Sequence, residues 1–362
     1  MFAALIALAA AAAPAAPTGI WEGTVGTLPV RACFVQQDWG SFGSYFYLSR
    51  LRLIALSAEE GRANVYFEGN GAPADQPRWS IESVSEGRLT GRWTSGARTL
   101  PVRLSRVSAA VGEEGPCGSL AFHRPRLEGV RTVTARATTD GVAYTRITLD
   151  TRSRFEVSFE TFALDGESEA VRRINAAVGQ GLAGDPPQWF QCIRDSLAQS
   201  PFEGSFDESL APAMITRRWL SVAHHWDGFC GGAHPDSSNV HRLFDLESGR
   251  EVDLHDWLNE SAVKRERPDG SDEDIVTLQP AFRDAVLRDW RPENPECEDV
   301  IRTADFWDIG LTRQALVLSP SLPHVVQACG EDFTLSFERL GPFLTPAGAA
   351  NLRALRAELP PG

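Results

Sequence analysis

Residues 19–36 read GIWEGTVGTLPVRACFVQ, which gives two short strand candidates separated by a break that contains glycine. The same punctuation by Gly, Pro, Asn and Ser continues to residue 123, and no segment in between has a helical period. Many short strands at close spacing favour an antiparallel meander that curls into a barrel or a sandwich. The nine strand candidates cover residues 20–25, 28–36, 44–49, 51–56, 64–69, 79–84, 88–93, 98–107 and 119–123.

The step His123-Arg124-Pro125-Arg126 marks a predicted domain boundary. We therefore expect an all-β domain over residues 18–124, either a lipocalin-like barrel or a sandwich. The comparison with lipocalins depends on Gly19-x-Trp21, which is similar to the strand that opens them. The remaining residues, 125–362, mix strands and helices without regular β-α alternation, which predicts an α+β domain with an antiparallel sheet and packed helices. The fold class of the whole chain is therefore α+β.

The elements of the second domain follow from changes of period. A long hairpin over residues 215–247 carries the sequence GFCGGAHPDSSN at its tip. The charged stretch 259–274 is predicted as a loop, and a final helix is expected to start with Thr345 as N-cap and Pro346 at its first position. The other strands are predicted over 129–138, 141–150, 154–164, 314–320 and 332–340, and the other helices over 171–182, 185–197 and 278–290.

The N-terminal segment predicts export. Residues 1–17 contain no charge, and Ala13-Pro14-Ala15 supplies the small-x-small pattern of a signal peptidase site, so we expect a signal peptide over 1–17. The basic residues that normally precede the apolar core are missing, so we expect the true start upstream of Met1. No later stretch is apolar over about 18 residues, so no transmembrane segment is expected. Lys264 is the single lysine among 35 basic residues, a coding bias that indicates a bacterial source and hence a periplasmic or secreted protein.

Six cysteines in an exported chain predict a disulfide framework. If bonds stay within domains, Cys33 pairs with Cys117, and four cysteines remain. For these, several connectivities are open, and we favour Cys192–Cys230 and Cys297–Cys329.

The formal charge of −13 argues against a nucleic-acid partner, because phosphates must be neutralised by a clustered basic surface. Cationic partners fit this charge better.

The most distinctive motif is Cys230-Gly231-Gly232-Ala233-His234-Pro235 at the hairpin tip. Paired glycines permit positive φ and close backbone approach, so Gly231, Gly232 and His234 could expose an imidazole together with free amides. This pattern is typical of a ligand-binding loop, and also of a structural turn in which His234 hydrogen-bonds the backbone. Asp236 and Asp245 complete the set of candidate binding residues.

No cofactor or metal is expected. Five histidines lie between residues 224 and 255, but His224 and His225 point to opposite faces of a strand, and the spacing does not match a zinc site. No Gly-x-Ser-x-Gly, His-Glu-x-x-His or phosphate-binding glycine motif occurs, so no catalytic residue is predicted.

Short motifs in the C-terminal half occur in a fairly specific order. They are Ile174-Asn175, Ser221, Gly231-Gly232-Ala233-His234-Pro235, Phe244-Asp245-Leu246 with Gly249, Leu254-x-Asp256-Trp257-Leu258, Gly310-Leu311 and the stretch from Phe333 to Leu340. In this order they resemble a widespread extracytoplasmic domain of unknown function, which also occurs in lysozyme-sensing anti-sigma-V factors and in peptidoglycan deacetylase C. The resemblance covers about residues 128–358.

This resemblance implies a cell-surface or periplasmic binding module, which in the anti-sigma factors grips lysozyme. The chain departs from the pattern after Leu311, where SPSLPHVVQACG replaces a tyrosine-rich stretch, and it has no deacetylase metal motif. Our first hypothesis is a non-enzymatic protein that binds peptidoglycan or a cationic lysozyme-like protein through the loop around His234. The alternative is an envelope hydrolase or transferase, acting on a cell-wall or glycan substrate, that pairs His234 with Asp236 or Asp245. A purely structural role would follow if the glycine loop were buried.

Overall fold

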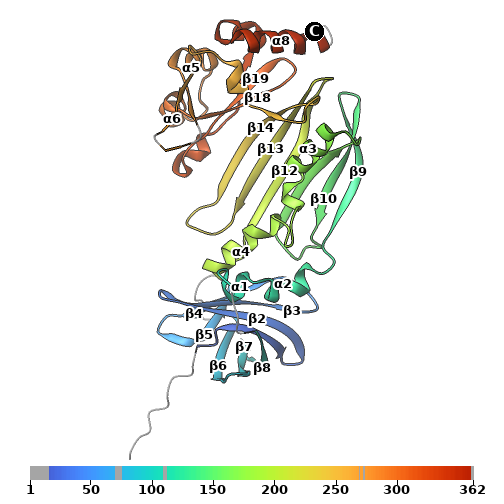
Figure 1. Cartoon of the computed structure of the whole chain (residues 1–362). Helices are drawn as coiled ribbons and strands as arrows, with labels where there is room; N and C mark the ends of the chain where they lie inside the picture. Colours follow the sequence, from blue (N-terminus) through green and yellow to red (C-terminus); the bar gives the residue numbers. More distant parts are fainter. Residues whose placement is uncertain (1–15, 70–75, 109–111, 269, 272–273, 360–362) are drawn as a thin grey trace, which may run out of the picture.

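The computed structural model describes residues 16–69, 76–108, 112–268, 270–271 and 274–359. Residues 1–15 of the predicted signal peptide lie outside the described residues. The molecule is elongated, with a barrel at one end, a seven-stranded sheet in the middle and a helix-rich C-terminal part at the other end (Figure 1). Within the described residues, no helix has both the length and the apolar character needed to cross a membrane.

Eight antiparallel strands form the barrel in sequence order, and β1 pairs with β8 to close it. The predicted all-β meander is therefore confirmed, and it is a barrel. Gly23 in β1 lies very close to the backbone of the neighbouring strand β8. A Cβ at this position would collide with the carbonyl oxygen of Arg103, so only glycine fits there. The strands are β1 Gly19–Val25, β2 Leu28–Gln37, β3 Gly40–Tyr47, β4 Ile54–Glu59, β5 Arg62–Glu68, β6 Arg78–Val84, β7 Arg88–Ser95 and β8 Arg98–Ser108.

Large aromatic side chains fill the interior of this barrel. Tyr45 and Trp79 pack with ring centroids 4.8 Å apart, and Phe34 lies 5.1 Å from Tyr66. All four are at most 1% exposed, together with Trp21. An eight-stranded barrel is just wide enough for side chains to fill it. The interior is thus a packed core, and ligand sites are to be sought outside it.

The ninth predicted strand, residues 119–123, is wrong. After α1 Gly115–Gly118, these residues begin the helix α2 Leu120–Leu127. Ser119 caps the helix by accepting a hydrogen bond from the amide of Phe122 at 3.3 Å, and Phe122 packs on Phe46 of the barrel at 5.2 Å between ring centroids. The cap and this packing outweigh the strand-like composition. Pro125, the predicted boundary, falls inside α2.

The central sheet has the order β15-β14-β13-β12-β11-β10-β9. All neighbours are antiparallel except β11 and β12, which are parallel and are connected by two helices that cover one face of the sheet (Figure 1). Strands β9, β10 and β11, the hairpin strands β13 and β14, and the first helix confirm predicted elements, whereas β12 and β15 were not predicted. The bounds are β9 Arg131–Thr139, β10 Val142–Asp150, β11 Val157–Leu164, α3 Glu169–Val178, η1 Gln180–Leu182, α4 Trp189–Gln199, β12 Ser205–Ile215, β13 Trp219–Phe229, β14 Asp236–Asp245 and β15 Glu251–Val252.

Helix α4 begins later than predicted. It was expected from residue 185, yet its first residue is Trp189. Two successive prolines, Pro186 and Pro187, restrict the residues before them to extended conformations, which delays the helix. The predicted apolar face is present, because Trp189, Ile193 and Leu197 are at most 4% exposed.

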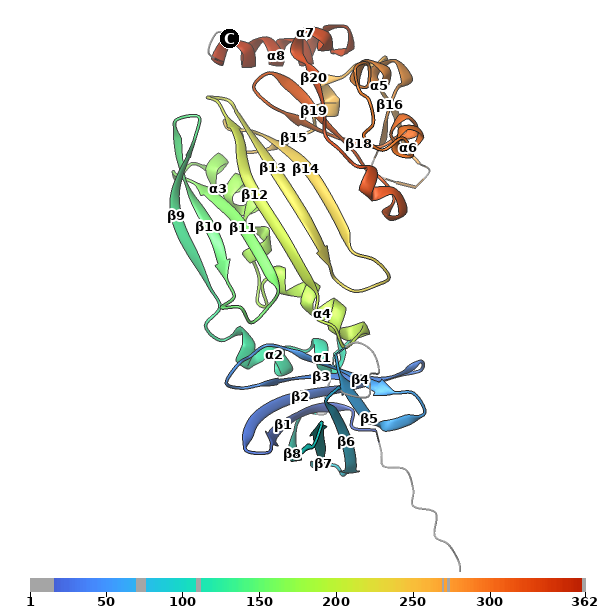
Figure 2. The same ribbon diagram turned by 180° about the vertical axis from the view of Figure 1, so that it is seen from behind.

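The C-terminal part packs on the other face of the sheet, with β18 against β14 (Figure 2). Thr345 caps the last helix as predicted, accepting from the amide of Gly348 at 3.0 Å. The elements are η2 Leu254–Trp257, β16 Val263–Glu266, β17 Ile275–Leu278, α5 Pro280–Val286, α6 Cys297–Thr303, β18 Trp307–Leu311, β19 Ala315–Pro320, η3 His324–Cys329, β20 Phe333–Ser336, α7 Phe337–Leu340, η4 Gly341–Phe343 and α8 Pro346–Glu358.

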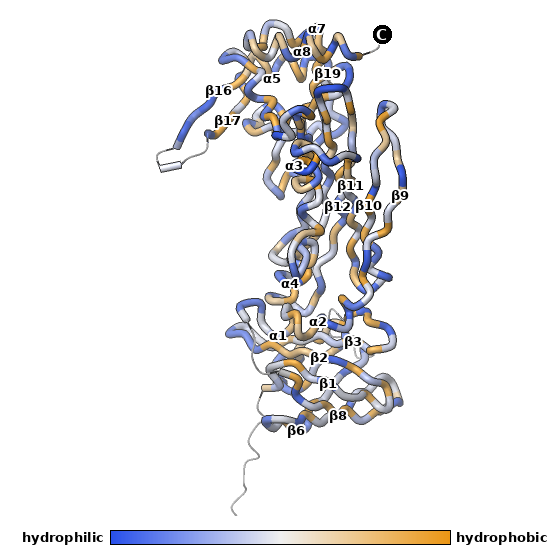
Figure 3. The backbone as a smooth tube through the Cα atoms, turned by 45° about the vertical axis from the view of Figure 1, so that its right-hand side comes forward, coloured by the Kyte–Doolittle hydropathy of each residue, from blue (hydrophilic) through white to orange (hydrophobic). Residues whose placement is uncertain are grey.

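Three predictions for this part are corrected. The helix expected over 278–290 ends at Val286, because Trp290 packs edge-on against Phe333 at 5.5 Å instead of extending it. The strand expected over 332–340 stops at Ser336 and continues as α7. The predicted charged loop contains the hydrophilic strand β16, which pairs with β17 and projects from the C-terminal part (Figure 3).

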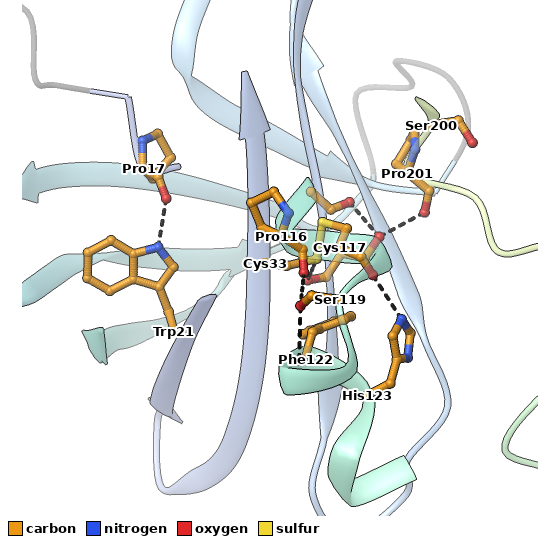
Figure 4. The surroundings of a disulfide bond; sticks show 12 residues. Pro17, Trp21, Cys33, Pro116, Cys117, Ser119, Phe122, His123, Ser200 and Pro201 are labelled. Atoms are coloured by element: carbon orange, nitrogen blue, oxygen red, sulfur yellow. Dashed lines mark hydrogen bonds between the residues drawn. A yellow bond between two sulfur atoms is a disulfide. The ribbon is translucent and has the colours of Figure 1, made fainter. Parts of the chain in front are cut away.

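The six cysteines form the bonds Cys33–Cys117, Cys192–Cys230 and Cys297–Cys329, which are the favoured pairs. Three disulfides indicate an oxidising, extracytoplasmic compartment. Figure 4 shows the first bond, which ties β2 to α1 beside His123. It lies in a hydrophobic cluster that joins barrel residues such as Phe42 to residues of α4 such as Phe190, so apolar packing connects the barrel to the helices of the sheet.

Candidate functional site

The tip of the β13–β14 hairpin is held against α4. The Cys192–Cys230 bond connects the two. Gly231 follows with φ of +99°, and a Cβ on it would lie 3.1 Å from Cα of Ser196 in α4, so glycine is required for this approach. Gly232 has a φ of +89°, and a Cβ on it would have no atom within 4 Å apart from its chain neighbours. Gly232 and His234 are exposed, so the loop is not the buried turn that a purely structural role would need.

His234 lies opposite η3, which is the segment after β19. The ring centroids of His234 and His324 are 6.4 Å apart. Between them is a cavity of about 310 Å³, whose wall includes Pro235, Gln327 and the 87% exposed Val325. The structure therefore places the predicted loop beside a segment 90 residues further along the chain.

Asp236 links the hairpin to η3. Its carboxylate accepts hydrogen bonds from the amide of Ser237 and from Nε2 of Gln327, both at 2.9 Å. Nδ1 of His324 lies 3.9 Å from the same oxygen. Asp236 is thus engaged by Gln327 and His324, and the structure gives no hydrogen bond between it and His234 among the described residues.

A second, larger hollow adjoins this contact. This acidic groove has a volume of about 390 Å³ and lies between β14, β18, the end of β19 and η3. Four carboxylates line it, from Asp236, Asp308, Glu331 and Asp332, and its described lining contains neither lysine nor arginine. The groove is therefore suited to a cationic group.

Asp308 differs from the other three carboxylates. Ser319 donates to Asp332 at 2.5 Å, and the indole of Trp290 donates to Glu331 at 2.7 Å. Asp308 is half-buried and accepts no hydrogen bond from any described residue. Burial raises the pKa of Asp308, although His255 and His241 oppose the shift. A carboxylate that is desolvated without a partner costs free energy, and a donor from a ligand would remove that cost.

His241 in β14 lies close enough to Asp308 for the two charges to interact. Burial lowers the pKa of His241, and the nearby carboxylates of Asp332 and Asp308 counteract this. Its Nδ1 is buried without a hydrogen-bond partner among the described residues. Gly310 in β18 packs directly against this ring. A Cβ on Gly310 would overlap the His241 side chain, so glycine is required there. Glycine at this position lets β18 approach β14 closely enough to form the groove.

Asp245 lies far from this site, at the opposite end of the ten-residue strand β14. Its carboxylate accepts from the amides of Glu247 and Ser248, at 3.0 and 2.8 Å, and pairs with Arg218 at 3.2 Å. It therefore shapes the turn after β14. The structure does not bring Asp245 together with His234.

The sequence did not reveal His324, Gln327, Asp308, Glu331 and Asp332 as site residues. The only available signal was Cys329, whose predicted bond to Cys297 fixes the end of η3. No group of three or more His, Cys, Asp or Glu residues in the described part of the chain is arranged to hold a metal ion.

A separate cleft lies on the helix-covered face of the sheet. Each of three adjacent strands places one ionisable residue among apolar neighbours there, namely Glu208, His224 and Arg242. Nε2 of His224 lies 2.9 Å from Oε1 of Glu208. The cleft has a volume of about 240 Å³, and Trp189 and Trp226 contribute to its walls.

No protein-family model matches the chain, and no curated protein matches it either. The chain is similar to two solved structures described as members of the DUF3298 family. The protein from Pseudomonas aeruginosa PAO1 is 12% identical, with a TM-score of 0.34, over 61% of this chain and 97% of that one. The protein from Bacteroides fragilis NCTC 9343 is 12% identical, with a TM-score of 0.37, over 61% of this chain and 96% of that one.

Proposed function

We propose that this chain is a non-enzymatic binding protein of the periplasm or the cell exterior, which captures a cationic protein of the lysozyme type in the acidic groove. The proposal rests on Asp308. Its half-buried carboxylate faces the groove and has no hydrogen-bond partner among the described residues. A lysine or arginine side chain inserted there would pair with it and with the neighbouring carboxylates.

Charge favours a cationic protein over peptidoglycan. The chain carries a formal charge of −13, and the described lining of the groove adds no lysine or arginine that would bind an anion. Peptidoglycan stem peptides carry carboxylates, which the groove would repel. A strongly basic protein would be attracted over a longer range and would associate faster at low salt. The sequence resemblance to lysozyme-sensing anti-sigma-V factors agrees with this choice of partner.

The test is the affinity of a purified c-type lysozyme for the wild-type chain and for Asp308→Asn, measured by isothermal titration calorimetry. We expect Asp308→Asn to weaken binding at least about tenfold, which corresponds to about 1.4 kcal/mol. The matched control is Glu167→Gln, which removes an exposed carboxylate just before α3 and should leave the affinity within about twofold. Absence of lysozyme binding, or equal affinities for all three proteins, contradicts the proposal. Capture of the chain by purified sacculi alone would favour peptidoglycan instead.

The His224–Glu208 pair favours a second candidate function, an envelope hydrolase or transferase. A carboxylate that holds one imidazole nitrogen leaves the other free to act as a general base, and this cleft brings the pair next to aromatic walls. Under this alternative, muropeptide turnover would be lost in Glu208→Gln and retained in His234→Ala. No turnover by the wild-type protein would eliminate it.

A further inference from the structure

Trp39 is a large aromatic residue that the barrel leaves in solvent. It follows β2 in the turn that leads to β3, and it is 68% exposed. One face of its indole stacks on Phe42, with ring centroids 5.6 Å apart and planes inclined by only 11°. Phe42 itself is 2% exposed and belongs to the core. The indole is therefore fixed from below and presents its other face outward.

The surroundings of Trp39 form a pocket of about 580 Å³. Its walls come from the β2–β3 turn, from the β4–β5 turn with Glu59 and Arg62, and from Pro201 in the segment after α4. These walls are braced. Nε2 of Gln36 donates to the carbonyl of Gly40 at 3.3 Å, and Oγ of Ser44 donates to the carbonyl of Pro201 at 2.8 Å. The pocket is thus built before any ligand arrives, which lowers the entropic cost of binding.

Hydrogen-bonding groups surround the aromatic surface. Glu59 and Arg62 form an ion pair at 3.4 Å on one side, with the guanidinium side chain 66% exposed. Ser57 and Glu60 also line the pocket. A flat apolar surface bordered by both donors and acceptors matches a pyranose ring, whose C–H face is apolar and whose edge carries hydroxyl groups.

Two other occupants fit the pocket less well. An anionic membrane surface would be repelled by Glu59 and Glu60, which flank the exposed indole. A purely apolar peptide side chain would cover Trp39 but would leave the carboxylates and the guanidinium desolvated without partners. The volume lies within the range of about 300–1,000 Å³ that is usual for small-ligand sites.

We propose that this pocket is a glycan-binding subsite, in which Trp39 stacks on an uncharged sugar residue of an oligosaccharide. It is separate from the acidic groove and does not depend on the proposed capture of a cationic protein. Glu59 and Arg62 bind the hydroxyl groups of the sugar and set its orientation on the indole.

The experiment titrates the full chain with tetra-N-acetylchitotetraose and with maltotetraose and follows calorimetric heats or protein amide chemical shifts. We expect saturable binding of at least one of them, weakened at least about tenfold in Trp39→Ala and only partly weakened in Trp39→Phe, which keeps an aromatic face. The matched control, Phe306→Ala, removes another exposed aromatic residue, 50% exposed, and should bind like wild type. Melting temperatures within a few degrees of wild type will show that the variants are folded.

Three outcomes overturn the proposal. These are no saturable binding of either oligosaccharide, equal binding by Trp39→Ala and wild type, or binding of anionic lipid vesicles alone. Lysozyme affinity should be unchanged in Trp39→Ala, so a failure of the glycan subsite is distinguishable from a failure of the acidic groove.

Discussion

Arg126 and Glu203 form a bidentate ion pair between α2 and the segment that follows α4. The two contacts measure 2.6 Å from Nη1 to Oε1 and 2.9 Å from Nη2 to Oε2, and the arginine side chain is completely buried. The same guanidinium donates to the carbonyl of Leu51 and lies 4.1 Å from the ring centroid of Phe155. One side chain therefore contacts the barrel, α2 and the sheet at their junction.

Replacing Arg126 with Ala should destabilise the protein by about 3–5 kcal/mol, because it leaves Glu203 buried without its cation. Burial raises the pKa of Glu203, and the Arg126 guanidinium counteracts this, so removing the arginine penalises the ionised carboxylate further. Chemical denaturation measures the change. The control is Arg52→Ala, which breaks the solvent-exposed pair with Glu156 at 3.2 Å and should cost less than about 1 kcal/mol. Similar losses in both variants would show that the buried pair has no special role.

His123 should make stability depend on pH. Its Nε2 donates to the carbonyl of Cys117 at 2.8 Å (Figure 4), and its Nδ1 accepts from Arg126 at 3.2 Å. Burial, together with the Arg126 and Arg194 charges, holds the pKa of His123 well below its usual range, so the folded state keeps it neutral. The unfolded chain binds a proton below about pH 6.5, and the contribution of His123 is therefore present above pH 6.5 and is lost as pH falls.

Lowering the pH from 7.5 to 5.5 should reduce the free energy of unfolding by about 1.4 kcal/mol through His123 alone. Urea titrations of wild type and His123→Gln at both pH values measure this contribution as the difference between the two pH dependences. Glutamine can donate to Cys117 and accept from Arg126 without titrating. Parallel pH dependences would mean that His123 is not the titrating group.

Removing the Cys192–Cys230 bond should release the hairpin tip from α4. The double variant Cys192→Ser/Cys230→Ser opens a covalent loop with a sequence separation of 38 and should lose about 2–4 kcal/mol of stability. It should also bind lysozyme more weakly, because the loop before His234 loses its anchor. Thermal unfolding and calorimetry check the two effects. Unchanged lysozyme affinity would show that the position of the hairpin tip does not affect lysozyme binding.

Gly231 and Gly232 provide a matched pair. Both have positive φ, so alanine at either position should cost about 1–2 kcal/mol of backbone strain. Only Gly231 approaches α4, where an added Cβ would lie 3.1 Å from Ser196. Gly231→Ala should therefore be the more destabilising variant and should displace the tip, as seen in amide chemical shifts of α4. Equal effects of the two substitutions would contradict the close packing.

The strands of the barrel could be predicted because turn residues separate them at short intervals, and its closure completes that pattern. Residues 119–123 were predicted as a strand because their composition is strand-like. They form a helix because Ser119 caps it and Phe122 packs against Phe46, and neither interaction can be read from composition. The glycine loop could be predicted from its positive-φ requirement. The acidic groove could not, because Asp308 and Asp332 reach Asp236 only through the packing of β18 and η3 on β14. The predicted domain limits, 18–124 and 125–362, remain a proposal that limited proteolysis can test.

The proposed function requires that the acidic groove captures a cationic, lysozyme-type protein. Amide hydrogen exchange of the full chain, with and without saturating lysozyme, tests it most directly. We expect slower exchange at residues 230–239 and 319–332, on both walls of the groove, and clearly weaker protection of the same residues in Asp308→Asn at the same lysozyme concentration. Protection confined to other parts of the chain, or none at all, would contradict it.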